Sequence, residues 1–457
     1  MCALCFLLCV SAFAADNFPP AAEQKLAREI YKEMIEVKSG FTTGTTTPIA
    51  ESVAARFKAA GFPPSDIFVG GAIPKKANVV VRYRGTGVRK PILLLAHIDV
   101  VEAKREDWTV DPFVFLEKDG YFYGRGTADD KAQAAVWVAT LLRYKREGYK
   151  PDRDLILALT ADEEGGGPYN GVDWLLKNHR NLIESEFALN EGARGMLVNG
   201  KRIEHQIGLA EKQFANLRWE VTNKGGHSAR PSPDNAIYHL AAALERLSHF
   251  EFEFHLTDIT REYFRQAAKT APQAEAADML RIADGDEAAM RRIAKASPPL
   301  NAMMRTTCVA TMLEGGHASN ALPQLAAANI NCRLLPDDNV DRIVAAFNKL
   351  LEGLPVKVSV SLNEGASPAS PMRDDIMKAF NRLTDIMWPS VITVPTMAVG
   401  GSDGRYLRSA GIPTYGVQGF FQDRDDVRAH GRDERMLVTS FYEGQTFLYE
   451  FVKALSH

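Results

Sequence analysis

The stretch ILLLAHIDVV, residues 92–101, sets the expectation for the whole fold, because it is a strongly apolar segment that carries two polar side chains. Five apolar residues run from Ile92 into His97, and Asp99 follows two positions later. The run predicts a buried strand, on which residues two apart share one face. Burying an unpaired carboxylate is costly, so other groups must compensate His97 and Asp99 at the end of this strand.

Similar strands alternate with helices along the first half of the chain. Strands are expected in NVVVRYRG from Asn78, which ends in a turn, in DLILALTADEE from Asp154 and in FALNEG from Phe187, and helices over 21–37, over 49–60 and from Asp129. This alternation predicts an α/β domain with a mixed, largely parallel sheet that is flanked by helices. In such sheets, functional groups gather at the carboxyl ends of the strands.

The pattern changes near Lys212. An alternating strand, FANLRWEVTN, is followed by a helix, an Ala-rich helical stretch from about Thr257 to Lys295, and several more strands. Strands with helices on one face predict a separate α+β domain inserted into the first. The expected division is 16–211 and 363–457 for the first domain and 212–362 for the insertion.

Composition narrows the class of protein. The chain has 457 residues, 46% hydrophobic and 24% charged, with a formal net charge of -3. It offers no basic surface for nucleic acid. Residues 1–15 contain an apolar run and end in small residues, which is typical of a secretory signal peptide, with a misplaced start on a cytoplasmic chain as the alternative. We expect a secreted or periplasmic protein without a stable membrane anchor.

Three of the five cysteines lie in that leader, which leaves Cys308 and Cys332. Both fall in strand-like segments. Two separate buried thiols are the expected state, and a disulfide formed after export is the alternative.

Several segments place a histidine or carboxylate after a strand-like run: AHIDVV with His97 and Asp99, GRGTADDK with Asp129 and Asp130, TADEEGGG with Glu163 and Glu164, ALNEGARG with Glu191, and far downstream RAHGRDER with His430. Taken singly, each residue is more often a structural histidine or a solvated acid. At one sheet edge, however, they would form a negative cluster that needs cations. A pair of divalent metals would neutralise it, and these ligands suit zinc, with manganese or cobalt as substitutes.

These motifs, together with GGHSARP, NALP, CRLLP and GGSDGR, resemble in type and order the M20 family of di-zinc metallopeptidases and deacylases. The family includes carboxypeptidases, dipeptidases and aminoacylases. The resemblance runs from His97 to His430 and implies a catalytic domain with an inserted lid or dimerisation domain.

The resemblance also implies roles for individual residues. The implied metal ligands are His97, Asp129 as the bridging carboxylate, Glu164, Glu191 and His430. Asp99 would orient His97, and Glu163 would be the general base that takes a proton from a metal-bridged water. A lid histidine, His227, would stabilise the oxyanion and in dimeric members reaches the neighbouring site.

Four further positions match substrate-binding motifs: Asn320, Arg333, Gly401 and Arg405. Arg333 is suited to a substrate carboxylate, with a structural ion pair as the alternative. Members with Glu at the Glu191 position tend to be carboxypeptidases or deacylases. The resemblance thus favours a carboxypeptidase-type exopeptidase, and it implies short peptides or N-acyl amino acids as substrates.

Two other functions remain open. A dipeptidase or N-acyl amino acid amidohydrolase would use the same machinery, and a non-catalytic scaffold would keep only the fold. A homodimer formed through the inserted domain is expected from the family.

Overall fold

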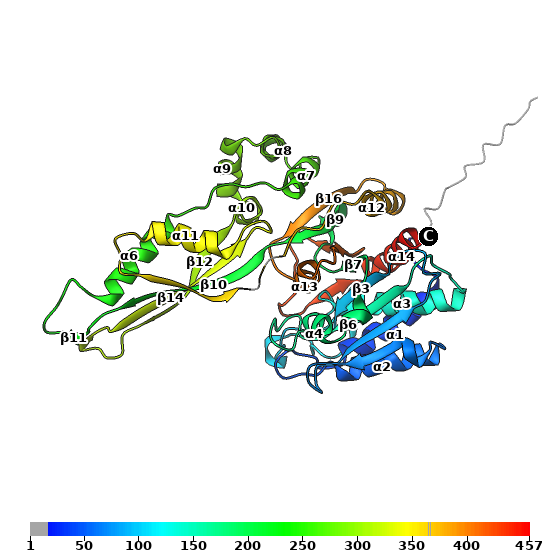
Figure 1. Ribbon diagram of the computed structural model, residues 1–457. Helices are drawn as coiled ribbons and strands as arrows, with labels where there is room; N and C mark the ends of the chain where they lie inside the picture. Colours follow the sequence, from blue (N-terminus) through cyan, green and yellow to red (C-terminus); the bar gives the residue numbers. More distant parts are fainter. Residues whose placement is uncertain (1–16, 364, 366) are drawn as a thin grey trace, which may run out of the picture.

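The computed structural model describes residues 17–363, 365 and 367–457, so the predicted leader lies outside the described residues. It consists of a main lobe and a long projecting lid (Figure 1). The main lobe is built on a ten-stranded mixed sheet. Its strands, in spatial order, are β1 (Ile67–Gly70), β2 (Asn78–Tyr83), β6 (Leu155–Thr160), β3 (Ile92–His97), β7 (Phe187–Asn190), β17 (Thr414–Val417), β9 (Lys201–Glu211), β8 (Gly195–Val198) and β18 (Phe421–Asp423), with β16 (Ile392–Ala398) also paired to β9.

The segment that opened the sequence analysis is β3, at the centre of this sheet. It pairs in parallel with both β6 and β7, and every residue of the strand is buried. Leu94 packs into the core on one face, whereas Leu93 and Leu95 pack into the core on the other. The predicted α/β class with a mixed, largely parallel sheet is confirmed.

Helices cover both faces of this sheet. One face packs against α1 (Ala21–Ile35), α2 (Thr47–Ala59), α3 (Lys131–Glu147), α12 (Asp374–Met387) and α14 (Val438–Leu455). The other face packs against α4 (Gly171–Asn178), α5 (Arg180–Ile183) and α13 (Gly404–Ser409). A small sheet of β4 (Leu116–Lys118), β5 (Tyr121–Tyr123) and β19 (Arg435–Leu437) lies beside them.

The chain leaves the large sheet at Lys212, between β9 and the first strand of the lid. The lid sheet has the order β12 (Thr307–Gly315), β14 (Leu325–Leu334), β10 (Gln213–Thr222) and β15 (Lys357–Asn363). Two helices, α6 (Ala236–Ser248) and α11 (Val340–Leu350), pack on one face, where the rings of Trp219 and Phe347 meet edge to face at 5.0 Å. The predicted catalytic domain with an inserted α+β domain is confirmed, and we propose the boundaries 16–211, 212–362 and 363–457.

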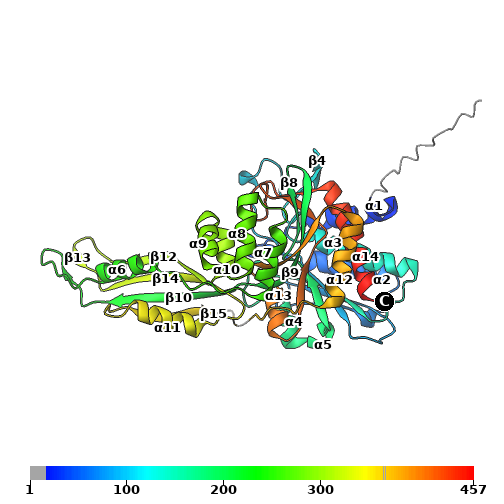
Figure 2. The same ribbon diagram turned by 90° about the horizontal axis from the view of Figure 1, so that it is seen from above.

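Four helices lie beside the inner end of the lid sheet, next to the main lobe, in both views (Figures 1 and 2). They are α7 (Asp258–Ala267), α8 (Gln273–Ala283), α9 (Glu287–Ala296) and α10 (Pro298–Met304). They share a small core of their own around Phe264 and Met304. Helix α7 also packs against β16 and β9, so this helical segment braces the base of the lid against the large sheet.

The expectation of two separate thiols is wrong, because Cys308 and Cys332 form a disulfide. The antiparallel pairing of β12 with β14 places the two residues directly opposite each other. No helix among the described residues is both long and apolar enough to cross a bilayer.

Candidate metal centre

Residues from five separate segments meet at one edge of the large sheet. His97 is the last residue of β3, and Glu191 directly follows β7. The loop after β6 carries Glu163 and Glu164, and the residue before the N-cap of α3 is Asp129. The fifth segment, the loop before β19, supplies His430. Parallel strands end on the same side, which is why residues so distant in sequence converge here.

Asp129 lies between the two histidines. Its Oδ1 is 2.9 Å from Nε2 of His97, and its Oδ2 is 3.1 Å from Nε2 of His430. On the outer sides, Nε2 of His97 lies 3.9 Å from a carboxylate oxygen of Glu191, and Nε2 of His430 lies 3.1 Å from one of Glu164. The two oxygens of one carboxylate thus face two imidazoles, which is the arrangement that a bridging ligand requires.

Asp99 has two kinds of contact beneath this cluster. Nδ1 of His97 lies 3.0 Å from the backbone carbonyl oxygen of Asp99, and 3.7 Å from its carboxylate. Donation from Nδ1 to that carbonyl leaves Nε2 with a lone pair that points into the cluster. The carboxylate of Asp99 accepts hydrogen bonds from the backbone N–H groups of Glu163 and Glu164, at 3.0 and 3.1 Å. Asp99 thereby fixes the β3 end and the β6 loop relative to each other.

Electrostatics of the cluster match a cation site. Burial raises the pKa of Glu163 well above its ordinary value, and the negative charges of Glu191, Asp403 and Glu164 act in the same direction. Burial and the neighbouring Asp129 likewise raise the pKa of Glu191. Carboxyl groups packed this closely cannot all ionise without a compensating positive charge. Two groups of candidate ligand atoms each lie within 4.8 Å of one another: His97, Asp129 and Glu164, and His97, Glu163 and Glu191. The imidazole and carboxylate donors therefore fit divalent metal ions of the zinc type.

A cavity of about 390 Å³ opens beside Asp129 and Glu191. Its lining also includes the segment 399–402, which contains the predicted residue Gly401. Ser402 is held by Glu211, which accepts hydrogen bonds from its backbone N–H and its hydroxyl at 2.9 and 2.6 Å. The cluster therefore faces a space large enough for a small substrate.

Comparisons with known proteins agree with this geometry. The family model described as peptidase family M20/M25/M40 matches residues 93–454. The chain belongs to this family. The prediction of an M20 hydrolase of peptide or amide bonds is confirmed.

Individual relatives are consistent with that assignment. The chain is 30% identical over 394 residues to the probable carboxypeptidase S-like 2 of Dictyostelium discoideum, which covers 82% of this chain and 74% of the relative. It is 28% identical over 375 residues to the human N-fatty-acyl-amino acid synthase/hydrolase PM20D1, with 80% and 74% covered. An M20 family metallo-carboxypeptidase from Sulfolobus solfataricus has the same fold, with a TM-score of 0.69 at 19% identity over 93% of this chain and 98% of that one.

Two of the M20 motif residues lie far from the cluster. His227 is in β11 (Gly226–His227), which pairs with β13 (Ala321–Leu322), and Asn320 accepts a backbone hydrogen bond from Ser228 there. Both His227 and Asn320 are exposed. This two-stranded tip is the far end of the lid from the main lobe (Figures 1 and 2). The structure of one chain does not bring His227 or Asn320 to the candidate metal ligands.

The two predicted arginines pack on aromatic rings. Arg333, near the end of β14, stacks over Phe214 with its guanidinium 4.8 Å from the ring centroid. Arg405 in α13 lies 4.6 Å from the centroid of Tyr406 and donates to its hydroxyl at 2.9 Å. A side chain added at Gly401 would stand 3.4 Å from the Arg405 guanidinium, so these two motif residues are neighbours.

Sequence reasoning missed a pair of charged residues next to the cluster. Arg125 and Glu434 stand within the motifs GRGTADDK and HGRDER, and they form a buried ion pair at 2.6 Å. The motifs drew attention to both segments, but nothing in a single sequence indicates that residues more than 300 positions apart are in contact.

Proposed function

We propose that this M20 hydrolase is a carboxypeptidase-type exopeptidase that uses two zinc ions, with manganese or cobalt as substitutes. The observation that carries the proposal is the convergence of two imidazoles and three carboxylates, with Asp129 between the imidazoles and the further carboxylate of Glu163 beside them. His97, Asp129 and Glu191 would hold one ion, and Asp129, Glu164 and His430 the other. The relative of Dictyostelium discoideum named as a probable carboxypeptidase supports cleavage at the C-terminal end of the substrate.

Residues of the chain would carry out proton transfer, positioning and substrate binding. Two bound divalent ions would supply Lewis-acid activation of a water molecule and of the scissile carbonyl. Glu163 takes the proton of the attacking water and passes it to the leaving nitrogen, because its carboxylate lies among the candidate ligand atoms beside His97 and Glu191. Asp99 holds the Glu163 backbone in place. The cavity next to Glu191 receives the residue to be released.

A second function within the same chemistry is hydrolysis of N-acyl amino acids. Curated relatives that carry this activity in their names are 28% identical to the chain over 80% of its length, and mouse aminoacylase-1 is 27% identical over 84%. Such a substrate also ends in a free carboxylate, so the same cavity accommodates it. A dipeptidase would differ only in requiring a free amino group on the residue that precedes the scissile bond.

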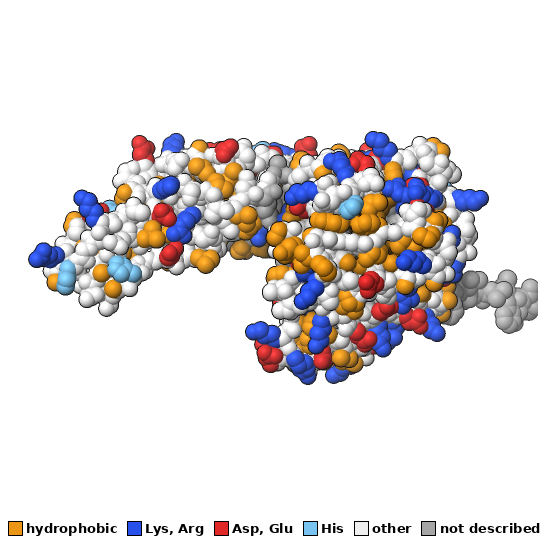
Figure 3. Space-filling view, turned by 60° about the horizontal axis from the view of Figure 1, so that its bottom comes forward, with side chains coloured by type: hydrophobic (Ala, Val, Ile, Leu, Met, Phe, Trp, Pro, Cys, Tyr) orange, Lys and Arg blue, Asp and Glu red, His pale blue; other side chains and the backbone are white. Residues whose placement is uncertain are grey.

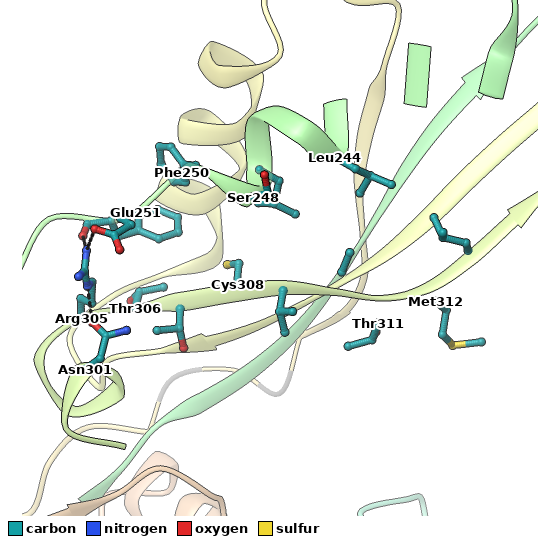
Figure 4. Close-up of a pocket in the computed structure, with 16 residues that line it drawn as sticks. Leu244, Ser248, Phe250, Glu251, Asn301, Arg305, Thr306, Cys308, Thr311 and Met312 are labelled. Atoms are coloured by element: carbon teal, nitrogen blue, oxygen red, sulfur yellow. Dashed lines mark hydrogen bonds and ion pairs between the residues drawn. The ribbon is translucent and has the colours of Figure 1, made fainter. Parts of the chain in front are cut away.

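We propose a homodimer in which the lid forms the interface. Strand β12 is an edge of the lid sheet, and its side chains Val309, Met312 and Leu313 are exposed. A groove of about 700 Å³ runs between this strand and α6, lined by residues such as Leu244, Phe250 and Met312 (Figure 4). Unpaired edge strands beside apolar surface favour pairing with a second chain. In a dimer, His227 and Asn320 of one chain would have access to the cluster of the other.

We also propose export of the protein, as the leader sequence predicts. The Cys308–Cys332 disulfide supports this location, because structural disulfides persist mainly in oxidising compartments.

The test of function is a substrate panel. Zinc-loaded protein without residues 1–15 is incubated with tripeptides, N-blocked peptides, free dipeptides and N-acyl amino acids, and the products are identified by mass spectrometry. Release of C-terminal residues from tripeptides and N-blocked peptides is the expected result. Cleavage confined to N-acyl amino acids or to free dipeptides would transfer the assignment to the alternative, and a chain that cleaves none of them in the presence of metal would be a scaffold.

A further inference from the structure

Two loops that carry proposed metal ligands are tied together by one buried ion pair. Strands β5 and β19 run antiparallel, with Tyr123 opposite Arg435. The chain leaves β5 into the loop that contains Asp129, and it enters β19 from the loop that contains His430. Arg125 lies on the first loop and Glu434 on the second, and both side chains are almost fully buried, at 3% and 1% exposure.

Glu434 serves as the acceptor for the Asp129 loop. One carboxylate oxygen accepts hydrogen bonds from the backbone N–H groups of Ala128 and Asp129, at 2.7 and 3.2 Å. The other oxygen accepts from the Arg125 guanidinium at 2.6 Å and from the backbone N–H of Gly126 at 3.2 Å. A single side chain therefore satisfies several donors of the segment that ends in Asp129, including the N–H of Asp129 itself.

Arg125 connects Glu434 to the loop that carries His430, the second proposed ligand. Its Nη2 donates to the backbone carbonyl of His430 at 3.3 Å, and its guanidinium lies over the Trp108 ring, 5.0 Å from the centroid. His430 has a φ of 63°, in the left-handed region that is unfavourable for a residue with a Cβ. Its backbone conformation therefore depends on contacts such as this one to persist.

From these contacts we infer that Arg125 and Glu434 are positioning residues that set the spacing of Asp129 and His430. The inference rests on the proposed metal site. Asp129 has one carboxylate oxygen 2.9 Å from His97 and the other 3.1 Å from His430, so a shift of its loop disturbs the ligands of both ions. Residues that hold metal ligands in place without contacting the metal typically contribute about 10- to 100-fold to metal affinity.

The test compares two matched Glu→Gln variants. Glu434→Gln removes the charge and places an NH₂ group, a donor, among the donors of the Asp129 loop. Glu443→Gln is the control: Glu443 is largely buried in an ion pair with Arg202 at 2.6 Å, in α14 and outside the cluster. Binding of Zn²⁺ is measured by isothermal titration calorimetry, the coordination geometry by the visible absorption of the Co²⁺-loaded protein, and the fold by thermal unfolding without metal.

We expect Glu434→Gln to bind zinc about 10- to 100-fold more weakly than the parent and to give an altered cobalt spectrum. The Glu443→Gln control should lose thermal stability but keep the parental affinity and spectrum. Arg125→Lys provides a second variant in case Glu434→Gln does not fold. It keeps a positive charge facing Glu434 but lacks the planar group that also reaches His430, so it should weaken zinc binding about tenfold.

Each outcome has a defined consequence. The inference would be overturned if Arg125→Lys, and Glu434→Gln where it folds, matched the parent in zinc affinity and cobalt spectrum. The proposed function would then remain intact. Equal loss of affinity in Glu434→Gln and Glu443→Gln would also overturn it, because the effect would then be general destabilisation. A parent that binds no divalent ion would overturn the inference and the proposed metal site together.

Discussion

The candidate metal centre and the tip of the lid both carry motif residues of the M20 family, but the residues of the first are buried and close together whereas those of the second are exposed. At the centre, His97 is 1% exposed and Asp129 touches two imidazoles, all supplied by one chain. At the tip, His227 and Asn320 are exposed at a short two-stranded ribbon at the far end of the lid. Figure 3 shows the hollow that separates the two lobes on one face. The fold of one chain therefore assembles the candidate metal ligands, whereas the tip residues would need a second chain or a large movement to reach the same cluster.

The largest expected effect is that of His97→Ala. The variant should lose tightly bound metal and about 10⁴-fold or more in turnover, because one ion loses a ligand and the bridging Asp129 loses a partner at 2.9 Å. Metal content by mass spectrometry and the rate of peptide hydrolysis provide the measurement. Parental metal content would remove His97 from the ligand set.

Glu163→Gln should separate chemistry from metal binding at the same centre. It should keep both ions and lose about 10³-fold in turnover, since the amide cannot take a proton from water. The measurement is kcat alongside metal content, with Glu443→Gln as a matched control that keeps kcat. A parental kcat in Glu163→Gln would show that another group is the base.

His227→Ala tests whether the tip of the lid takes part in catalysis. Loss of the donor should lower kcat by about 100-fold without changing metal content. Mixing His227→Ala with Glu163→Gln protein should restore activity, because a mixed dimer would contain one site with both residues. If the mixture is no more active than its components added together, His227 does not act across a lid-mediated dimer.

The smallest expected effect on activity is that of replacing the disulfide. Cys308 and Cys332 are 24 residues apart in sequence, and the double Ala variant should lose about 3 kcal/mol in the free energy of unfolding. The metal centre lies in the other lobe, so kcat should stay near the parental value. Denaturant unfolding of the metal-loaded protein measures the first quantity. An unchanged midpoint would show that the cross-link adds nothing to the lid.

The sequence predicted the main lobe well because its signals are local. Apolar runs such as that of β3 end in polar motif residues, and the predicted strand that runs into His97 and the predicted helix over 21–37 match β3 and α1 closely. The order of the motifs was enough to name the ligand candidates. Their convergence follows from the general rule that parallel strands end at one edge.

Features that depend on long-range register were not predictable. The pairing of Cys308 with Cys332 requires the alignment of β12 on β14, which includes a shift between Ala310 and Met312. The contact of α7 with β16 joins segments more than 120 residues apart. The polar, Ala-rich sequence around α7 does not indicate which strand the helix packs against. The same holds for Arg125 and Glu434, whose interaction is visible only once β5 and β19 are side by side.

A zinc titration tests the central claim most directly. The protein is stripped with a chelator, reloaded stepwise with Zn²⁺, and assayed at each step for bound metal and for hydrolysis of a cleaved panel substrate. We expect no turnover in the stripped protein and activity that rises with loading to a plateau at two ions per chain. Full activity in the metal-free protein would contradict the central claim.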